Sequence, residues 1–211
     1  MSDSPTLLDL PRYTVLANPQ STLNLPQVDD AGELRRVGCF MVVDESKRVV
    51  GFRADDAPDL SPSFKLFTDG ECTEELLSVE PDEGESWCVR RSGSDVGRLV
   101  PSTRGLTAQR WHVEDGSGQV VAELDDVSLG GRLKRRYRRA QYRENWRLAP
   151  TAGGAPTFLL RDPVAAAYVL RVVGPEEPAI DRALTLAAAV CVPTLEGLTA
   201  FLRPDFKRFE G

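Results

Sequence analysis

The sequence predicts a mainly β (α+β) protein, a closed antiparallel β-barrel around a central hydrophobic C-terminal helix. Three observations favour this fold class. Short runs of β-branched and aromatic residues recur between turn residues, apolar and polar side chains alternate along those runs, and one late helix lacks a polar face. The chain has 211 residues, of which 41% are hydrophobic and 27% charged, as is typical of one globular domain.

Four successive units from residue 37 onward have the pattern of β-hairpins. Turn sequences such as Asp69-Gly70 and Asp115-Gly116 separate the two runs of a unit and supply the backbone angles that tight turns need. In the fourth unit Trp111 and Val113 share one face, which predicts a sheet with a core side and a solvent side. The paired runs are 39–43 with 49–52, 64–67 with 76–79, 87–90 with 96–100, and 110–114 with 120–124.

The remaining segments are less regular. Strands are also expected at 13–16, 142–148, 157–160 and 168–173. Between residues 126 and 148, helical spacing of apolar residues predicts a short helix, which Gly130 and Gly131 weaken in its first turn. The helically spaced residues are Leu129, Leu133, Tyr137 and Ala140.

The helix expected over 181–192 is the most informative segment. Asp181 suits the N-cap position and Pro193 is expected to end the helix. No charged residue follows Arg182 within it, so the helix has to be buried on every side. At about 1.5 Å per residue it spans roughly 18 Å, too short for about 30 Å of hydrocarbon. The pattern favours a helix threaded through a β-structure, and the alternative is a helix between a sheet and the C-terminal tail.

Hairpins followed by one apolar helix give the chain a resemblance to the tubby C-terminal-like superfamily, which includes the LURP-one-related proteins and the phospholipid scramblases. The features that carry it are the segments Phe40 to Asp44 and Trp111 to Asp115 and the helix Asp181 to Val192. The resemblance implies a closed barrel around a central helix and binding of phosphoinositide-like headgroups. The chain departs from the scramblases in three features, a palmitoylation-type cysteine cluster, an acidic calcium-binding segment and a transmembrane tail, so lipid scrambling is not expected.

The expected organisation has three parts. Residues 1–35, punctuated by prolines, form a loosely ordered leader in which one strand could cap the fold. Residues 36–193 form the barrel with its central helix. Residues 194–211 form a tail in which phenylalanines alternate with basic residues. Such a tail either packs on its own domain, is disordered, or lies at a membrane interface.

The strongest charge anomaly lies in residues 132–147, which carry a net charge of +7, whereas the whole chain carries −6. An anionic partner is therefore expected for one face, either anionic phospholipid or an acidic protein. The alternative is internal pairing with the acidic stretch 71–85 or with Asp125 and Asp126. Nucleic acid is not expected as a partner, since the protein as a whole is acidic. The candidate ligand-binding residues are Arg132, Lys134, Arg135, Arg136, Arg138, Arg139 and Arg143.

Catalysis is not expected. No phosphate-binding loop, dinucleotide fingerprint or nucleophile elbow occurs, and the only histidine, His112, is expected to face solvent. The four cysteines have no metal-ligand spacing, so neither a metal nor a cofactor is predicted, and the cysteines are expected to be reduced. An enzyme with an unrecognised carboxylate pair is the third hypothesis. No secretory signal or transmembrane segment is expected, which favours a cytoplasmic protein, peripheral at the inner membrane face.

Overall fold

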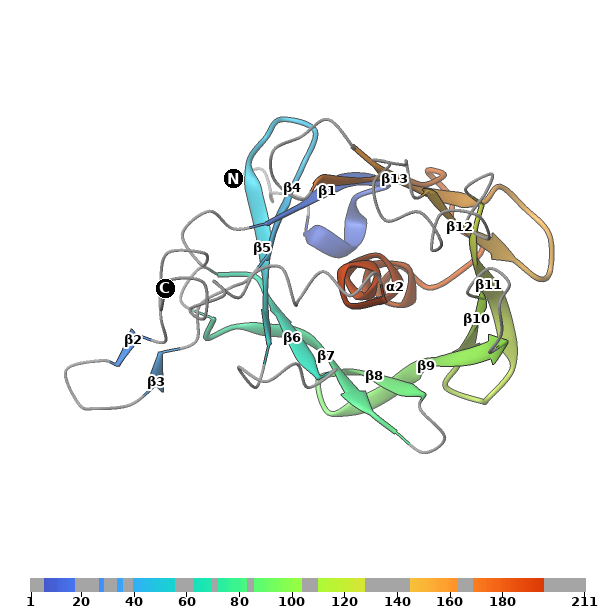
Figure 1. The fold of residues 1–211 in the computed structure, drawn as a ribbon, viewed down its shortest axis with the longest axis horizontal. Helices are drawn as coiled ribbons and strands as arrows, with labels where there is room; N and C mark the ends of the chain where they lie inside the picture. Colours follow the sequence, from blue (N-terminus) through green and yellow to red (C-terminus); the bar gives the residue numbers. More distant parts are fainter. Residues whose placement is uncertain are drawn as a thin grey trace, which may run out of the picture.

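The computed structural model contains a closed β-barrel whose strands run antiparallel all the way round (Figure 1). Around the ring the strands follow the order β1, β14, β13, β12, β11, β10, β9, β8, β7, β6, β5, β4. A separate two-stranded sheet joins β2 (Gln27–Val28) and β3 (Leu34–Arg35). The structure describes residues 6–17, 27–28, 34–35, 40–55, 63–69, 72–82, 86–103, 110–127, 145–162 and 169–195.

The predicted hairpins are confirmed, because the two runs of each unit pair with one another. Successive side chains along each strand alternate between the core and the solvent. Val113 is buried in the core, whereas His112 lies opposite Glu123 on the solvent side. The barrel strands are β1 (Arg12–Ala17), β4 (Phe40–Val43), β5 (Val49–Asp55), β6 (Phe64–Phe67), β7 (Glu75–Pro81), β8 (Trp87–Arg91), β9 (Ser94–Thr103), β10 (Arg110–Asp115), β11 (Val120–Asp126), β12 (Asn145–Pro150), β13 (Thr157–Arg161) and β14 (Val169–Val173).

Strand β1 closes the ring. It pairs with β14 on one side and with β4 on the other, and its inward residues Tyr13 and Val15 are buried. The barrel therefore begins at Arg12, ahead of the boundary at residue 36 that the sequence suggested. A strand with neighbours on both sides needs no long apolar run to be stable, because the ladder satisfies its backbone groups.

Helix α2 (Arg182–Leu195) lies inside the ring of strands (Figure 1), which confirms the threaded arrangement. Every residue from Ala187 to Val192 is fully enclosed. Asp181 acts as the predicted N-cap, since its Oδ1 accepts a hydrogen bond of 2.6 Å from the Ala183 backbone N–H. The expected stop at Pro193 is wrong, because the helix continues to Leu195. Proline removes only one backbone donor from the helix at this position.

A buried arginine contacts the last turns of α2. Arg53 on β5 is only 1% exposed, and its guanidinium lies over the ring of Phe64 at 4.0 Å and that of Phe40 at 5.2 Å. It also donates a hydrogen bond to the Val190 carbonyl. The guanidinium thus contacts two aromatic rings and the backbone of α2 within the core. The aromatic rings and the helix together fix this end of the core.

The connections between strands divide the barrel into two rims. The turn rim carries the hairpin turns, in which an aspartate often holds the backbone: Asp115 Oδ1 accepts hydrogen bonds from the N–H groups of Ser117 and Gln119. The opposite rim carries the two longest connections between barrel strands, residues 18–39 and 127–144. Consecutive antiparallel strands alternate in direction, so the connection from β11 to β12 starts and finishes at this opposite rim.

Candidate functional site

The interior of the barrel offers little space for a ligand, because α2 and the inward side chains fill it. One cavity of about 20 Å³ lies beside Leu7 and Leu8 of the 3-10 helix η1 (Leu7–Asp9), with Tyr13 and Thr185 also in its lining. That volume holds about one water molecule. Among the described residues, the outer surface of the barrel is therefore the place to look for a site that takes a larger ligand.

The described residues hold no group of three histidine, cysteine or acidic side chains that could bind a metal ion. Cys88 and Cys191 are buried free thiols, and Cys72 is half-buried. Burial raises the pKa of both Cys88 and Cys191, which keeps these thiols protonated and unreactive. Trp87 stacks on Trp111 with ring centroids 5.2 Å apart, and Trp146 lies in the core. None of these groups forms a catalytic arrangement.

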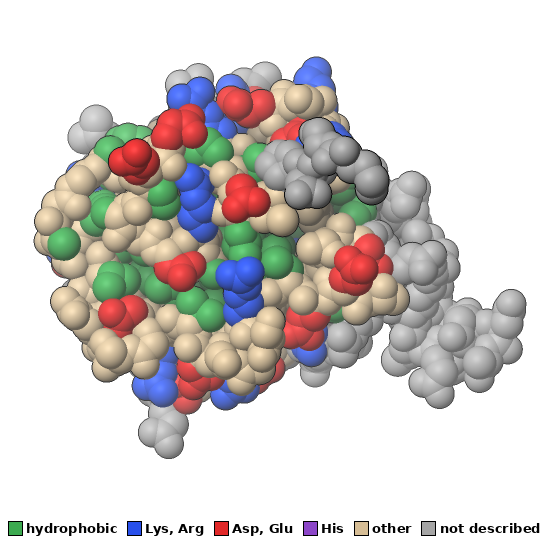
Figure 2. Space-filling model, turned by 180° about the vertical axis from the view of Figure 1, so that it is seen from behind, with side chains coloured by type: hydrophobic (Ala, Val, Ile, Leu, Met, Phe, Trp, Pro, Cys, Tyr) green, Lys and Arg blue, Asp and Glu red, His purple; other side chains and the backbone are tan. Residues whose placement is uncertain are grey.

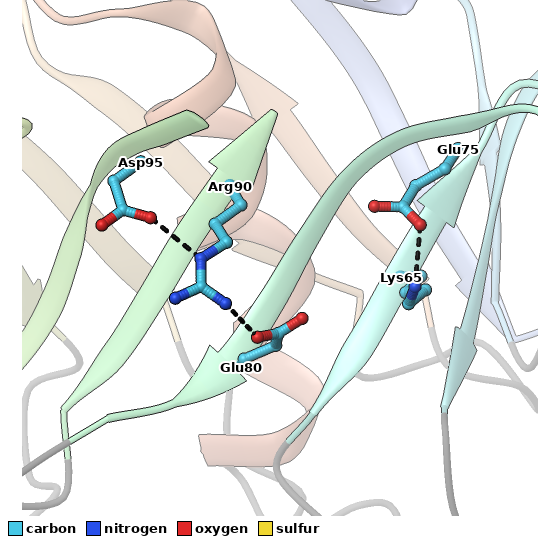
Figure 3. Close-up of polar contacts among 5 residues, drawn as sticks. All are labelled: Lys65, Glu75, Glu80, Arg90 and Asp95. Atoms are coloured by element: carbon cyan, nitrogen blue, oxygen red, sulfur yellow. Dashed lines mark hydrogen bonds and ion pairs between the residues drawn. The ribbon is translucent and has the colours of Figure 1, made fainter. Parts of the chain in front are cut away.

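The outer wall of β6 to β9 is covered with ion pairs (Figure 3). Lys65 on β6 contacts Glu75 on β7 at 2.8 Å. Arg90 on β8 lies between Glu80 on β7 and Asp95 on β9, with Nε 2.9 Å from Asp95 Oδ1. Hydrogen bonding to the Arg90 guanidinium lowers the pKa of Asp95. Each cation named here contacts at least one carboxylate and the carboxylates outnumber the cations, so these ion pairs present no excess positive charge to a partner.

The described part of the acidic stretch proposed as an internal partner for the arginine-rich segment belongs to this wall, and Glu71, Glu83 and Glu85 lie outside the described residues. Glu75 and Glu80 pair with the cations just named, and Asp82 pairs with Arg98 at 3.1 Å. Strands β8, β9 and β10 stand between β7 and β11 in the ring. These carboxylates are therefore paired with neighbours on their own wall, and three strands separate them from the strand that leads into the arginine-rich segment.

Asp125 on β11 pairs with two arginines. Arg110 on β10 approaches one carboxylate oxygen at 2.8 Å, and Arg147 on β12 approaches the other at 3.2 Å. The three residues lie opposite one another across the strands. Part of the internal-pairing hypothesis is thus confirmed for Arg147, the last cation of the basic run. The second cation beside Asp125 leaves this cluster with a net positive charge.

The seven predicted ligand-binding residues lie outside the described part of the chain, as does the short helix expected around them. The residues that flank this segment, at the end of β11 and the start of β12, are described. Asp126 at the end of β11 lies opposite Trp146 on β12, and the Val127 N–H donates to the Asn145 carbonyl at 2.9 Å. The segment 132–143 is therefore joined at both sides to paired strands of the barrel. Its point of attachment is the rim opposite the hairpin turns.

The sequence does not indicate the exposed hydrophobic residues on the outer surface of β12 to β14. The structure places four of the five exposed large hydrophobic residues it describes at or beside the outer surface of β12 to β14, and the fifth, Val49, begins β5. Phe158 is 40% exposed, Leu160 37% and Val173 36%. We call this surface the apolar–arginine wall, and its members are Phe158, Leu160, Val173, Arg147 and Arg171.

The register of β12, β13 and β14 brings the members of the apolar–arginine wall together. Phe158 lies opposite Val173 on one side and Arg147 on the other, and Leu160 lies opposite Arg171. The fourth exposed residue, Val127, joins the wall through its hydrogen bond to Asn145, which faces Leu160. Alternation alone could not identify this surface, because residues 157–160 offer Phe158, Leu159 and Leu160 in a row, with no polar residue to mark the solvent side.

The face of the molecule in Figure 2 differs from this wall. Acidic and basic side chains are interspersed there around hydrophobic atoms, and no area of a single charge stands out. No helix among the described residues combines the length and the hydropathy needed to cross a membrane. The chain was compared with family models, with curated proteins and with solved structures, and none of them matches it.

Proposed function

We propose that this protein is a non-catalytic binding module that attaches to anionic phospholipid surfaces through its arginine-rich segment, residues 132–143. The tubby-like resemblance, with its phosphoinositide-like ligands, belongs to this proposal. Seven of the twelve residues in the segment are basic and none is acidic. Guanidinium groups form bidentate contacts with phosphate oxygens, which suits them to lipid headgroups.

The observation that carries the proposal is the pairing of the described carboxylates. Acidic residues on the β6–β9 wall pair with cations of the same wall, and Asp125 already contacts two arginines. The carboxylates named here therefore already have cationic partners of their own, whereas the side chain of Asp126, at the junction itself, lies outside the described residues. An external anion provides the missing counter-charge.

The expected strength follows from the number of cations that reach the surface. Each Lys or Arg near an anionic membrane contributes about 1 kcal/mol. About four such residues facing the bilayer give about 4 kcal/mol, which corresponds to roughly millimolar affinity. The segment alone thus supports weak, salt-sensitive attachment. Tighter binding requires a second contact.

Vesicle flotation tests the proposal. The protein is mixed with vesicles of phosphatidylcholine alone, or of equimolar phosphatidylcholine and phosphatidylserine, at low and at physiological salt. We expect flotation with the anionic vesicles only, weakening as salt rises. Neutralising Arg135, Arg136 and Arg139 to glutamine should weaken the partitioning about a hundredfold, since three cations are lost.

A matched variant controls for net charge. Substituting Arg48, Arg90 and Arg98 with glutamine removes the same three charges from residues that pair with carboxylates elsewhere on the barrel. This variant should float like the unmodified protein. Equal flotation with neutral and anionic vesicles, or equal loss in both variants, would show that the arginine-rich segment has no special affinity for anionic lipid. Capture of an acidic protein that depends on the same three arginines, without vesicle binding, would favour the protein-interaction alternative.

A further inference from the structure

We propose that the apolar–arginine wall is a second membrane contact, which inserts Phe158, Leu160 and Val173 into the interfacial layer of the anionic bilayer that the arginine-rich segment binds. The inference rests on the proposed function, because it takes the same bilayer as its partner. It adds an apolar anchor and a defined orientation of the barrel on the membrane.

The first argument is the position of the exposed apolar side chains. Phe158 and Val173 are direct partners across β13 and β14, and Leu160 follows Phe158 on the same face of β13. The wall continues through Asn145 to Val127, the residue from which the arginine-rich connection leaves β11. The described wall therefore extends along β12 to β14 up to the strand ends from which residues 128–144 leave the barrel.

The second argument is charge. The apolar side chains of the wall alternate with Arg147 and Arg171, which are 43% and 63% exposed. Each arginine also pairs with one carboxylate, Arg147 with Asp125 at 3.2 Å and Arg171 with Asp162 at 3.5 Å, so its exposed side remains open to a phosphate group. Arginines beside apolar residues can hold phosphate groups while their aliphatic stems stay in the interfacial layer. The ion pairs of the β6–β9 wall contain more carboxylates than cations, and this wall carries no large exposed apolar residue among those described. Within the described part of the barrel, the apolar–arginine wall is where exposed apolar side chains and arginines lie side by side.

The third argument is size. A specific protein–protein interface usually buries more than about 1,000 Å² in total. Three partly exposed side chains form the centre of a much smaller patch. A bilayer needs only a few apolar side chains at its interface when basic residues add their attraction. The small apolar area beside strong positive charge therefore favours a lipid surface over a protein partner.

The test substitutes Phe158→Thr and Leu160→Thr together. Threonine keeps a high preference for strands and the outward position avoids the core, so the barrel should fold normally. The matched control is Val49→Thr, which removes an equally exposed apolar side chain from β5 on another part of the barrel. Flotation is measured with vesicles of equimolar phosphatidylcholine and phosphatidylserine over a series of salt concentrations, and thermal unfolding verifies that each variant is folded.

We expect the double variant to bind anionic vesicles about tenfold more weakly, which corresponds to about 1.4 kcal/mol. Its loss should persist at high salt, because apolar contact is not screened, whereas the glutamine variant of Arg135, Arg136 and Arg139 should lose mainly the salt-sensitive part. Val49→Thr should bind like the unmodified protein.

The outcomes separate the two proposals. If the arginine variant loses vesicle binding and the double threonine variant does not, the apolar anchor is refuted and the proposed function stands. If neither variant differs from the unmodified protein, both proposals fail. If the double threonine variant instead loses binding to a protein partner while keeping its affinity for vesicles, the wall is a protein interface and the inference is overturned.

Discussion

Gly97 marks the closest approach between the barrel wall and its central helix, and its replacement by alanine gives a sharp test of the packing. Gly97 lies on β9, opposite Val89 on β8 and Asp115 on β10. A Cβ atom added there would come within 2.1 Å of the Glu114 carbonyl oxygen and 2.9 Å of a methyl group of Leu184 on α2. The nearer atom belongs to the backbone and cannot rotate away.

The cost of this substitution can be worked out from those distances. Cβ atoms essentially never come closer than 3.0 Å to another heavy atom, so β9 and β10 have to separate by about 1 Å at this point. Overpacking of this kind costs about 3 kcal/mol. That is a large share of the roughly 5 to 15 kcal/mol that stabilises an ordinary domain.

Urea unfolding followed by circular dichroism measures the free energy of unfolding of Gly97→Ala. Gly116→Ala is the control, since its Cβ would meet nothing nearer than 3.2 Å, and we expect it to cost less than about 1 kcal/mol. A Gly97→Ala variant within about 0.5 kcal/mol of the unmodified protein would refute the close contact between β9, β10 and α2.

Three further predictions concern single groups. Tyr13→Phe should raise the free energy of unfolding by about 1 kcal/mol, because its buried hydroxyl has no hydrogen-bond partner among the described residues; a loss of stability in urea unfolding would reveal a partner such as a bound water. Hydrogen bonds from Thr73 and Ser117 lower the pKa values of Asp69 and Asp115 in the folded protein, so both carboxylates stabilise the fold above about pH 4 and stop doing so as the pH falls further. Thermal unfolding across this range should show a falling midpoint, and a midpoint unchanged by acid would count against these turn contacts. Cys191 should react with a thiol reagent only after unfolding, since it is fully enclosed; rapid labelling of the folded protein at this residue would contradict the position of α2.

The sequence could predict the barrel and its helix because their signals are local. The lack of charge after Arg182 required complete burial of the helix, and aspartate-containing turns marked the hairpins. Strand β1 carries no such signal at its ends, and its place in the ring depends on pairing with β14 and β4, which are distant in sequence. Pro193 suggested a helix end, yet the helix continues for two residues beyond it.

The candidate site was only partly predictable for a similar reason. The basic run is a property of consecutive residues and is visible in the sequence. The apolar–arginine wall depends on the register between β13 and β14, which decides that Phe158 faces outward while Leu159 lies in the core. Burial of Arg53 between two aromatic rings is likewise a tertiary effect, because nothing in its own strand distinguishes it from a surface arginine.

Hydrogen–deuterium exchange with and without vesicles of equimolar phosphatidylcholine and phosphatidylserine tests the central claim most directly, because it locates the lipid contact along the chain. The account predicts slower exchange in peptides covering residues 128–144 when anionic vesicles are present, with unchanged exchange on the ion-paired strands β6 to β9. Protection confined to β6–β9, or none in 128–144 while the protein is bound to the vesicles, would contradict it.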